Sequence, residues 1–366
     1  MLAVTNGVRY AEKQTRGNDM NTAQKLRFNA DGHFRILMVS DFHMGKNPKF
    51  ETNLNDRVTQ GLEMLLRHTQ PDFVMLGGDQ CIHAESIAQA AELLSQVIRP
   101  VLDRELPWAA VFGNHDNETG LPTREEEKAY LTIPGCRNQI HPNASFGAGN
   151  YCLHLYACDG DRLLFNLFAL DSHREITDFI DLFQMDKETR FILPEHFNEG
   201  ATGAAPTFEQ AMWYYETSRQ IEQREGRKIP AVLFMHIPLP EFLQVTRNPE
   251  ECDAVGNKRE TLGCCELNFG LFGACLQRGD VKGIFFGHEH LCDIQGEYCG
   301  ITMAQDAALG YNMSCHDDLR GGRVIDLCAD GTLQTYAVKL IDLMGLDAMR
   351  RKDYFEGGCK YFIRKL

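Results

Sequence analysis

Short apolar runs alternate along the chain with longer stretches in which apolar residues recur every three or four positions. The runs are bounded by Gly, Pro, Asp or Asn, which is typical of buried strands. They predict strands over residues 34–40, 72–78, 107–114, 150–157, 162–170, 230–236 and 281–287, and a late hairpin over 323–338. The periodic stretches predict amphipathic helices over 57–68, 84–98 and 207–224. Strands that alternate with helices are the pattern of layered α/β folds.

The pattern changes near both ends of the chain. Residues 1–30 are polar and aperiodic, so we expect a flexible N-terminal arm there. From 31 to 343 the alternation continues without a repeat or a linker, which predicts one large domain followed by a C-terminal extension over 344–366. The least regular stretch, 238–263, is rich in Pro, Asn, Cys and charge, and we expect a long loop beside the active face.

Composition narrows the class of protein. An apolar content of 43% with 24% charged residues is typical of a soluble globular chain. The 51 acidic and 37 basic side chains give a net charge of −14, which argues against binding along a nucleic-acid backbone. A small phosphorylated substrate or a phosphoprotein stays compatible with this charge if metal ions supply local positive charge.

The same sequence favours a cytoplasmic location away from membranes. No apolar run approaches the ~18 residues that a membrane span needs, and the first residues lack the apolar region of a secretory signal. Thirteen cysteines without a CxxC pair indicate reduced thiols, not a cysteine zinc site. No motif indicates an oligomeric state.

Residues of metal-ligand type follow five of the predicted strands directly. They are Asp41 and His43 after the first strand, Asp79 after the second, Asn114, His115 and Asp116 after the third, His236 after the sixth, and His288 and His290 after the seventh. The carboxyl ends of strands line the ligand crevice of an open α/β sheet, so these side chains are expected to converge. Mixed carboxylate, imidazole and amide ligands suit Mn, Fe or Zn, and two such ions ~3.5–4 Å apart can hydrolyse phosphate esters.

The ordered set Asp-x-His, Gly-Asp, Gly-Asn-His-Asp, His and Gly-His-x-His resembles the calcineurin-like metallophosphoesterase superfamily. All five motifs are present between Asp41 and His290. The segments "PWAAVFGNHD", "HIPLPEF" and "GHEHLCDIQGE" resemble a branch related to purple acid phosphatases and to yeast-type signalling phosphatases. The resemblance implies a four-layer α/β/β/α sandwich of two mixed sheets flanked by helices.

The resemblance also implies roles for the motif residues. One metal would be held by Asp41, His43 and His290, the other by Asn114, His236 and His288, with Asp79 bridging both. His115 would stabilise the phosphoryl oxygens or protonate the leaving alcohol, with Asp116 orienting its ring. Purple enzymes carry a Tyr three residues after the bridging Asp, where this chain has Ile82, so the protein is expected to be colourless.

Hydrolysis of a phosphate monoester by metal-activated water is the preferred activity. A phosphodiesterase acting on cyclic nucleotides or other small diesters is the alternative, because the same motifs serve both reactions. A non-catalytic scaffold on this fold is disfavoured, since no ligand and no catalytic His is missing.

Several neighbouring residues are better explained by structure than by chemistry. We expect Phe242 to pack in the core, Cys81 to act as a small buried apolar residue, and His33 and His83 to lie on the surface. The stretch from Asp171 to His173 is expected to be a structural turn, with contact to the substrate as its alternative.

Overall fold

Two β-sheets pack face to face at the centre of the molecule. The computed structural model describes residues 25–45, 54–81, 84–118, 122–186 and 203–344. One sheet has seven strands in the order β1-β5-β6-β7-β8-β10-β9, and the other has five in the order β12-β11-β2-β3-β4. Both sheets contain parallel and antiparallel pairs, so both are mixed.

The strands of the seven-stranded sheet are β1 (Leu26–Arg27), β5 (Tyr151–Tyr156), β6 (Leu163–Ala169), β7 (Ala231–Met235), β8 (Val281–Phe286), β9 (Gln295–Tyr298) and β10 (Ile301–Gln305). Those of the five-stranded sheet are β2 (His33–Val39), β3 (Phe73–Gly77), β4 (Trp108–Val111), β11 (Gly321–Cys328) and β12 (Leu333–Lys339). The helices are α1 (Asn55–Thr69), α2 (Ile87–Val97), α3 (Arg99–Leu102), α4 (Thr123–Tyr130), η1 (Ala144–Phe146), α5 (Asp178–Leu182), α6 (Phe208–Glu225), α7 (Phe242–Arg247), α8 (Leu271–Arg278) and α9 (Leu340–Met344).

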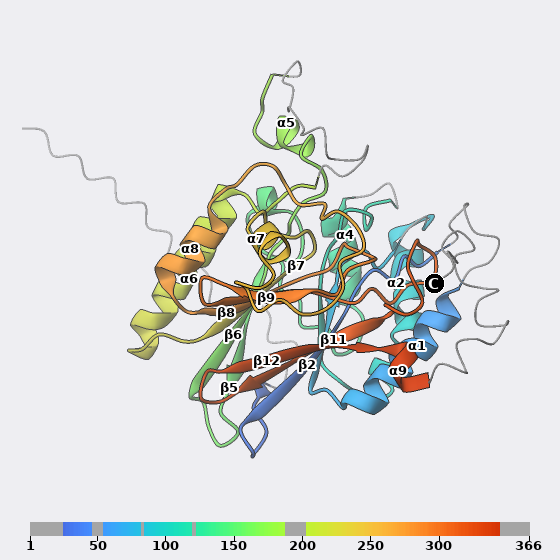
Figure 1. Cartoon of the computed structure of the whole chain (residues 1–366), viewed down its shortest axis with the longest axis horizontal. Helices are drawn as coiled ribbons and strands as arrows, with labels where there is room; N and C mark the ends of the chain where they lie inside the picture. The colour runs from blue at the N-terminus through green and yellow to red at the C-terminus, as the bar shows by residue number, and fades with distance from the viewer. Residues whose placement is uncertain (1–24, 46–53, 82–83, 119–121, 187–202, 345–366) are drawn as a thin grey trace, which may run out of the picture.

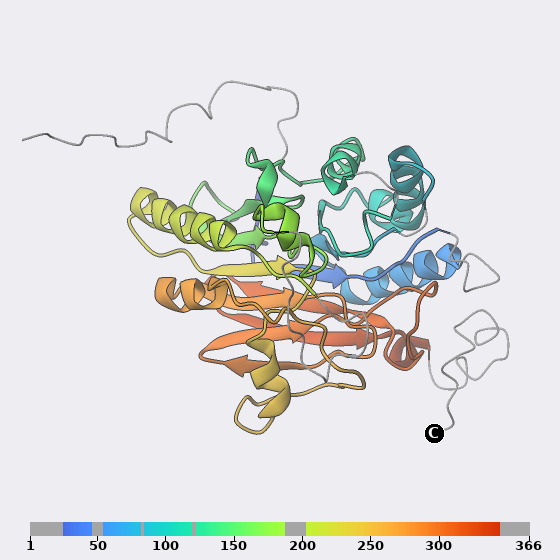
Figure 2. The same cartoon turned by 90° about the horizontal axis from the view of Figure 1, so that it is seen from above.

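Three apolar clusters define four layers. The cluster between the sheets joins residues such as Ile36 and Met75 of one sheet to Phe234 and Phe285 of the other. A second cluster packs α1 and α2 on the outer face of the five-stranded sheet, and a third packs α6 and α8 on the outer face of the seven-stranded sheet. These helices lie on opposite sides of the molecule, with the sheets between them (Figures 1 and 2). The expected α/β/β/α sandwich is confirmed.

The helices form where apolar spacing and end residues agree. In α1 the buried residues Val58, Leu62, Leu65 and Leu66 recur every three or four positions, so a single face meets the sheet. In α6 the side chain of Thr207 accepts from the backbone of Gln210, and the Gln210 side chain accepts from the backbone of Thr207. This capping box satisfies two donors that the first helical turn leaves free.

The structure differs from expectation at two places. Within the expected N-terminal arm, β1 pairs in parallel with β5, and Phe28 is buried in the core between the sheets. Sequence analysis missed β1 because a strand of two residues is too short to show an alternation of apolar and polar positions. The stretch 238–263, expected as a loop, contains the short helix α7, which places Phe242 in the apolar core as expected. Residues 1–24 and 345–366 lie outside the described residues.

No helix among the described residues is long and apolar enough to cross a membrane.

Candidate metal centre

The candidate ligands follow strands that run in parallel within each sheet. In one sheet β2, β3 and β4 are parallel neighbours, and in the other β7 and β8 are. Parallel strands end at one edge, so the turns that follow them meet there. The structure thus collects at one edge the residues that sequence analysis selected over almost 250 positions.

Six of these residues form two groups. Asp41, His43 and His290 form one group, and Asp79, His236 and His288 form the other, with the ligand atoms of each group within 4.8 Å of one another. The groups adjoin, because His43 Nε2 lies 3.9 Å from Asp41 Oδ1 and 3.7 Å from Asp79 Oδ2. Asp79, a member of the second group, therefore lies next to the first group.

Asn114 joins the second group through its side-chain oxygen. Its Oδ1 lies 3.0 Å from Nδ1 of His288. The seven expected ligands are thereby all brought to the same edge, from both sheets. Mixed oxygen and nitrogen donors in this arrangement suit borderline divalent ions.

Two buried polar atoms in the centre lack a hydrogen bond, although charged neighbours lie 3.2 and 3.5 Å away, and they test whether the site fits metal ions. Asp41 Oδ1 and His236 Nε2 are buried and form no hydrogen bond. A buried polar atom without a partner costs free energy unless another group satisfies it. His43 Nε2 and His290 Nε2 lie only 3.1 Å apart, so two nitrogen atoms converge on one point. The donor set fits divalent metal ions.

Hydrogen bonds on the outer side of the rings fix which nitrogen points inward. His236 Nδ1 lies 2.8 Å from the carbonyl oxygen of Gly77, and His290 Nδ1 lies 3.1 Å from that of Ser314. A carbonyl only accepts, so each Nδ1 carries the proton and each Nε2 keeps its lone pair for the centre. Such second contacts are typical of metal-binding histidines.

The turns that carry the ligands adopt uncommon backbone conformations. Asp41, His43, Asp79 and His288 have positive φ angles of 56°, 47°, 55° and 82°. Such angles cost free energy for residues other than Gly and cluster at functional sites. Close packing adds a second constraint, since a Cβ on Gly78 would lie 2.2 Å from Nδ1 of His236. The Gly beside the bridging Asp is therefore required by contact.

Burial and neighbouring charge set the protonation of the ligands. Burial, aided by the charge of neighbouring histidines and opposed by the carboxylates, lowers the pKa of His43 and of His288 to about 3, so both rings are neutral, as a ligand must be. Burial opposes ionisation of Asp79, yet the positive charge of His236 holds the Asp79 pKa well below its ordinary value. Asp79 is thus ionised, as a ligand must be. Burial lowers the pKa of His236, but the charge of Asp79 outweighs it together with that of Asp41 and raises the His236 pKa to about 10, so this ring gives up a proton when it binds an ion.

His115 lies beside the ligands with one ring nitrogen engaged. Its backbone N–H donates to Oδ1 of Asp79, at 2.8 Å, and its ring centroid lies 5.2 Å from that of His43. Nδ1 lies 2.5 Å from Oε1 of Glu118, one turn further along the chain. Burial lowers the His115 pKa, but the bond to Glu118 and the negative charges of Asp79 and Glu118 together outweigh it and raise the pKa to about 9. Nε2 is left as the nitrogen available to a substrate.

Asp116 was expected to orient the ring of His115, but its carboxylate is bonded to backbone amides, and Glu118 contacts the ring instead. Asp116 is fully buried and accepts backbone N–H bonds from Asp79, Cys81 and Gly113, at 2.8, 3.0 and 2.7 Å. Its side chain turns away from solvent toward these amides, while the more exposed Glu118 reaches the ring. Sequence analysis missed Glu118, although its i+3 spacing from His115 in "HDNE" was a usable signal.

Most of the neighbouring residues have the structural roles that were expected of them. Cys81 is fully buried, which raises its pKa well above the range of a reactive thiol. Asp171 accepts from the backbone of Ala148 and His173, and Ser172 accepts from that of Ile237, so this turn is held by its own bonds. Ile82 and His83 lie outside the described residues.

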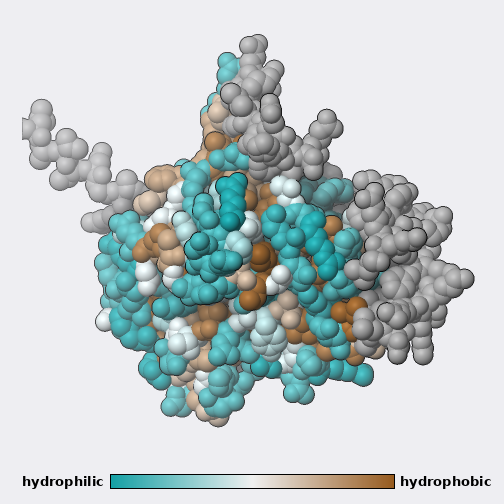
Figure 3. All heavy atoms as spheres, viewed as in Figure 1, coloured by the Kyte–Doolittle hydropathy of each residue, from teal (hydrophilic) through white to brown (hydrophobic). Residues whose placement is uncertain are grey.

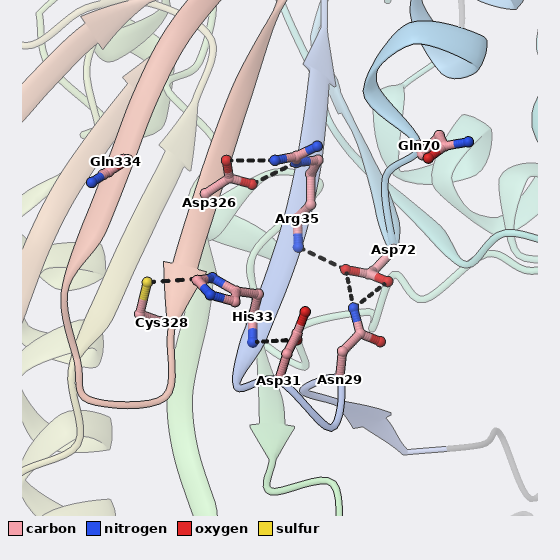
Figure 4. A pocket seen from close by; sticks show the side chains of 9 residues that line it. All are labelled: Asn29, Asp31, His33, Arg35, Gln70, Asp72, Asp326, Cys328 and Gln334. Atoms are coloured by element: carbon pink, nitrogen blue, oxygen red, sulfur yellow. Dashed lines mark hydrogen bonds and ion pairs between the residues drawn. The ribbon is translucent and has the colours of Figure 1, made fainter.

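A polar cavity of about 370 Å³ lies at the other end of the five-stranded sheet (Figure 4). Its polar groups pair with one another: Arg35 with Asp326, Asn29 with Asp72, and the exposed His33 with Cys328. His33 begins β2 and Asp41 follows its end, so the two residues are separated by the length of the strand, roughly 20 Å at the rise of a strand. The cavity is therefore separate from the metal centre.

Comparison with known proteins agrees with this geometry. The family described as calcineurin-like phosphoesterase matches residues 34–292. "Probable inactive purple acid phosphatase 28" of Arabidopsis thaliana is 30% identical over 315 residues, which cover 78% of this chain and 73% of that protein. The phosphatase DCR2 of Saccharomyces cerevisiae is 26% identical over 295 residues, 76% of this chain and 46% of that protein.

A solved dimetal phosphatase from Danio rerio aligns with 83% of this chain and 98% of its own, at 13% identity and a TM-score of 0.47. The family match spans most of the chain and includes every ligand named above. This chain belongs to the calcineurin-like phosphoesterase family.

Proposed function

We propose that the protein is a metal-dependent phosphomonoesterase. The observation that carries the proposal is the pair of adjoining ligand groups, with Asp79 between them and the ring of His115 beside them. When bound, two divalent ions such as Mn, Fe or Zn supply an activated water and neutralise the charge of the phosphoryl oxygens.

The residues of this chain have distinct parts in that reaction. Asp41, His43 and His290 would hold one ion at the phosphoryl site. Asn114, His236 and His288 would hold the other ion, with Asp79 between the two groups. His115, steadied at Nδ1 by Glu118, presents Nε2 to the phosphoryl group or to the leaving oxygen. A donor held in place at that atom lowers the barrier where charge develops. No Ser or Cys nucleophile is required.

The names of relatives set the question that an assay must answer. Three Arabidopsis thaliana relatives are named probable inactive purple acid phosphatases, whereas the yeast relative is named a phosphatase. In this chain all seven ligand positions and His115 converge, which supports an active enzyme over a scaffold.

The test compares a monoester with a diester. Metal-loaded protein is assayed with p-nitrophenyl phosphate and with bis-p-nitrophenyl phosphate in Mn²⁺, Fe²⁺ and Zn²⁺. A higher kcat/KM for the monoester is expected. Preference for the diester would favour the phosphodiesterase, and inactivity on both, with two ions bound, would favour a scaffold.

We further propose a reducing location such as the cytoplasm. Support comes from the cysteines, because all twelve in the described residues are free.

A further inference from the structure

A cleft adjoins the metal-bearing edge on the side of β4 and β6. Strand β6 neighbours β7 in one sheet, and β4 neighbours β3 in the other, so the carboxyl ends of β4 and β6 adjoin the ligand turns. Gly113 and Asn117, which flank the "NHD" turn, line a cavity of about 150 Å³ together with His173, Arg174 and Asp178. The turn that carries His115 therefore forms one wall of this cleft.

The far wall of the cleft leads to an aromatic cavity. Asp178 begins α5, and Leu182 at the end of the same helix lines a second cavity of about 250 Å³ with Phe183, Phe208 and Phe269. The rings are in contact, since the Phe183 centroid lies 5.7 Å from that of Phe269, and both stack against or abut Phe179. Helix α5 projects from the body of the molecule at the top of Figure 1, and apolar residues lie near its base in Figure 3.

The aromatic cavity is apolar and accessible. Phe208 is 63% exposed and Phe183 is 43% exposed. Exposed large apolar side chains that gather around one hollow mark an interaction site more often than scattered ones do. At about 250 Å³ the cavity is smaller than the ~300–1,000 Å³ of a small-molecule site, and it suits one large side chain.

The rim of this aromatic cavity is acidic. Glu209, on the first turn of α6, lines the cavity and is exposed. Asp181 precedes the lining residue Leu182 on α5, and Glu175 lies on the loop before α5; both are also exposed. The guanidinium among the residues that line the two cavities, Arg174, is already paired with Asp178 at 3.0 Å. A partner that brings positive charge is thus favoured.

We propose that this cleft and the aromatic cavity bind the polypeptide around the phosphorylated residue of a protein substrate. The phosphoryl group lies at the metal centre, a large apolar side chain fills the aromatic cavity, and Lys or Arg residues of the substrate face the acidic rim. The inference rests on the proposed phosphatase function and names its substrate class.

The observations favour a polypeptide over a lipid phosphate. A buried apolar anchor surrounded by polar contacts is the usual arrangement of a protein-binding hot spot. Carboxylates at the rim would repel an anionic membrane surface, whereas they attract basic side chains. The small cavity holds one side chain, not an extended acyl chain.

The experiment measures kcat/KM for a series of phosphoserine peptides. The series places one Leu or Phe at each position from four before to four after the phosphoserine, in a background of Gly, Ser and Lys. We expect at least one position at which the apolar residue raises kcat/KM about tenfold over the peptide without it. Replacing Lys by Glu in that peptide should lower kcat/KM, and the loss should shrink as salt is added.

Variants locate the effect on the protein. In Phe208→Ser and Phe183→Ser the ratio of kcat/KM for the best peptide to that for p-nitrophenyl phosphate should fall about tenfold. Leu276→Ser is the matched control, because Leu276 is also 43% exposed but lies on α8 and is not among the residues that line either cavity. The control should keep the wild-type ratio.

Three outcomes would overturn the proposal. They are an equal kcat/KM for all peptides, an unchanged ratio in both Phe variants, and a preference for long-chain alkyl phosphates that depends on Phe208. If p-nitrophenyl phosphate is not hydrolysed at all, the proposed function fails separately. Binding of the fluorescent peptides to the metal-loaded chain then decides the inference, and binding that Phe208→Ser does not weaken would overturn it.

Discussion

At the scale of single residues, His115 and Glu118 act together: Glu118 orients the imidazole ring, and the ring of His115 contacts the substrate. Glu118 holds Nδ1 of the ring at 2.5 Å, so the direction in which Nε2 points depends on a side chain that is not a ligand. His115→Ala should leave the metal content near that of the wild type and lower kcat by roughly 10²–10⁴-fold, the usual scale for a lost acid or base. Glu118→Gln should keep the metals and give a smaller loss.

The pair is tested by varying the leaving group. If the ring protonates the departing alcohol, the losses in both variants should be larger for alkyl phosphates than for p-nitrophenyl phosphate. Loss of metal from His115→Ala, measured by elemental analysis, would contradict the division of roles.

Glu126 gives a second prediction at this scale, on stability and pH. The side chain is buried, its Oε1 accepts from Tyr130 at 2.7 Å and its Oε2 has no partner. Burial raises the Glu126 pKa to about 9. Between the ordinary value near 4.5 and about 9, the folded state holds a proton that the unfolded state lacks, so the stability of the wild type falls as pH rises.

Glu126→Gln removes this titration. Its free energy of unfolding, relative to the wild type, should therefore rise with pH through this window, by up to about 1.4 kcal/mol per pH unit. Urea unfolding at pH 5, 7 and 8.5 measures it. Glu125→Gln, on the exposed side of the same helix, is the control and should show no such trend.

At the scale of elements, Asp116 joins the turns that follow β3 and β4. Its carboxylate accepts from Asp79 and Cys81 in one turn and from Gly113 in the other. Asp116→Asn keeps the shape but turns an amide NH₂ toward backbone donors. We expect a loss of about 1–3 kcal/mol in stability and a ~10–100-fold loss in metal affinity.

Asp72→Asn provides the control. Asp72 also accepts a backbone N–H, from Arg35 at 2.8 Å, but it does so at the opposite end of the sheet. It should affect stability without changing metal affinity. A normal metal affinity in Asp116→Asn would show that the link between the two turns does not matter for the ligands.

The same elements show what sequence could predict. Strands β2, β3, β4, β7 and β8 were predicted because each is a continuous apolar run that ends in a ligand-type residue, and their convergence followed from parallel pairing. The partner of His115 was missed although the i+3 spacing of Glu118 indicated it, because the turn carries two acidic residues and only the burial of Asp116 shows which of them is left to reach the ring. Strand β1 was missed since its pairing with β5 spans well over 100 positions.

At the scale of the whole molecule, the two ligand groups tie the sheets together. Asp41 and His43 follow a strand of the five-stranded sheet, whereas His290 follows a strand of the other. The second group likewise takes Asp79 from one sheet and His236 and His288 from the other. An ion bound to either group would therefore join the two sheets, which are also held by the apolar cluster between them and by hydrogen bonds such as that from Tyr151 to the carbonyl oxygen of Ala110, at 3.0 Å.

Metal removal should consequently destabilise the fold as well as abolish activity. A ligand that binds only the folded state adds about 2.7 kcal/mol per site at 100 times its Kd. Elemental analysis should find about two ions per chain, and chelation should lower the melting temperature. His43→Ala should weaken one ion selectively, whereas Asp79→Ala, which removes the bridge, should lose both ions and gain no stability from added Mn²⁺. A melting temperature that chelation leaves unchanged, while activity disappears, would mean that the ions do not hold the sheets and that the apolar core and the hydrogen bonds between the sheets are sufficient.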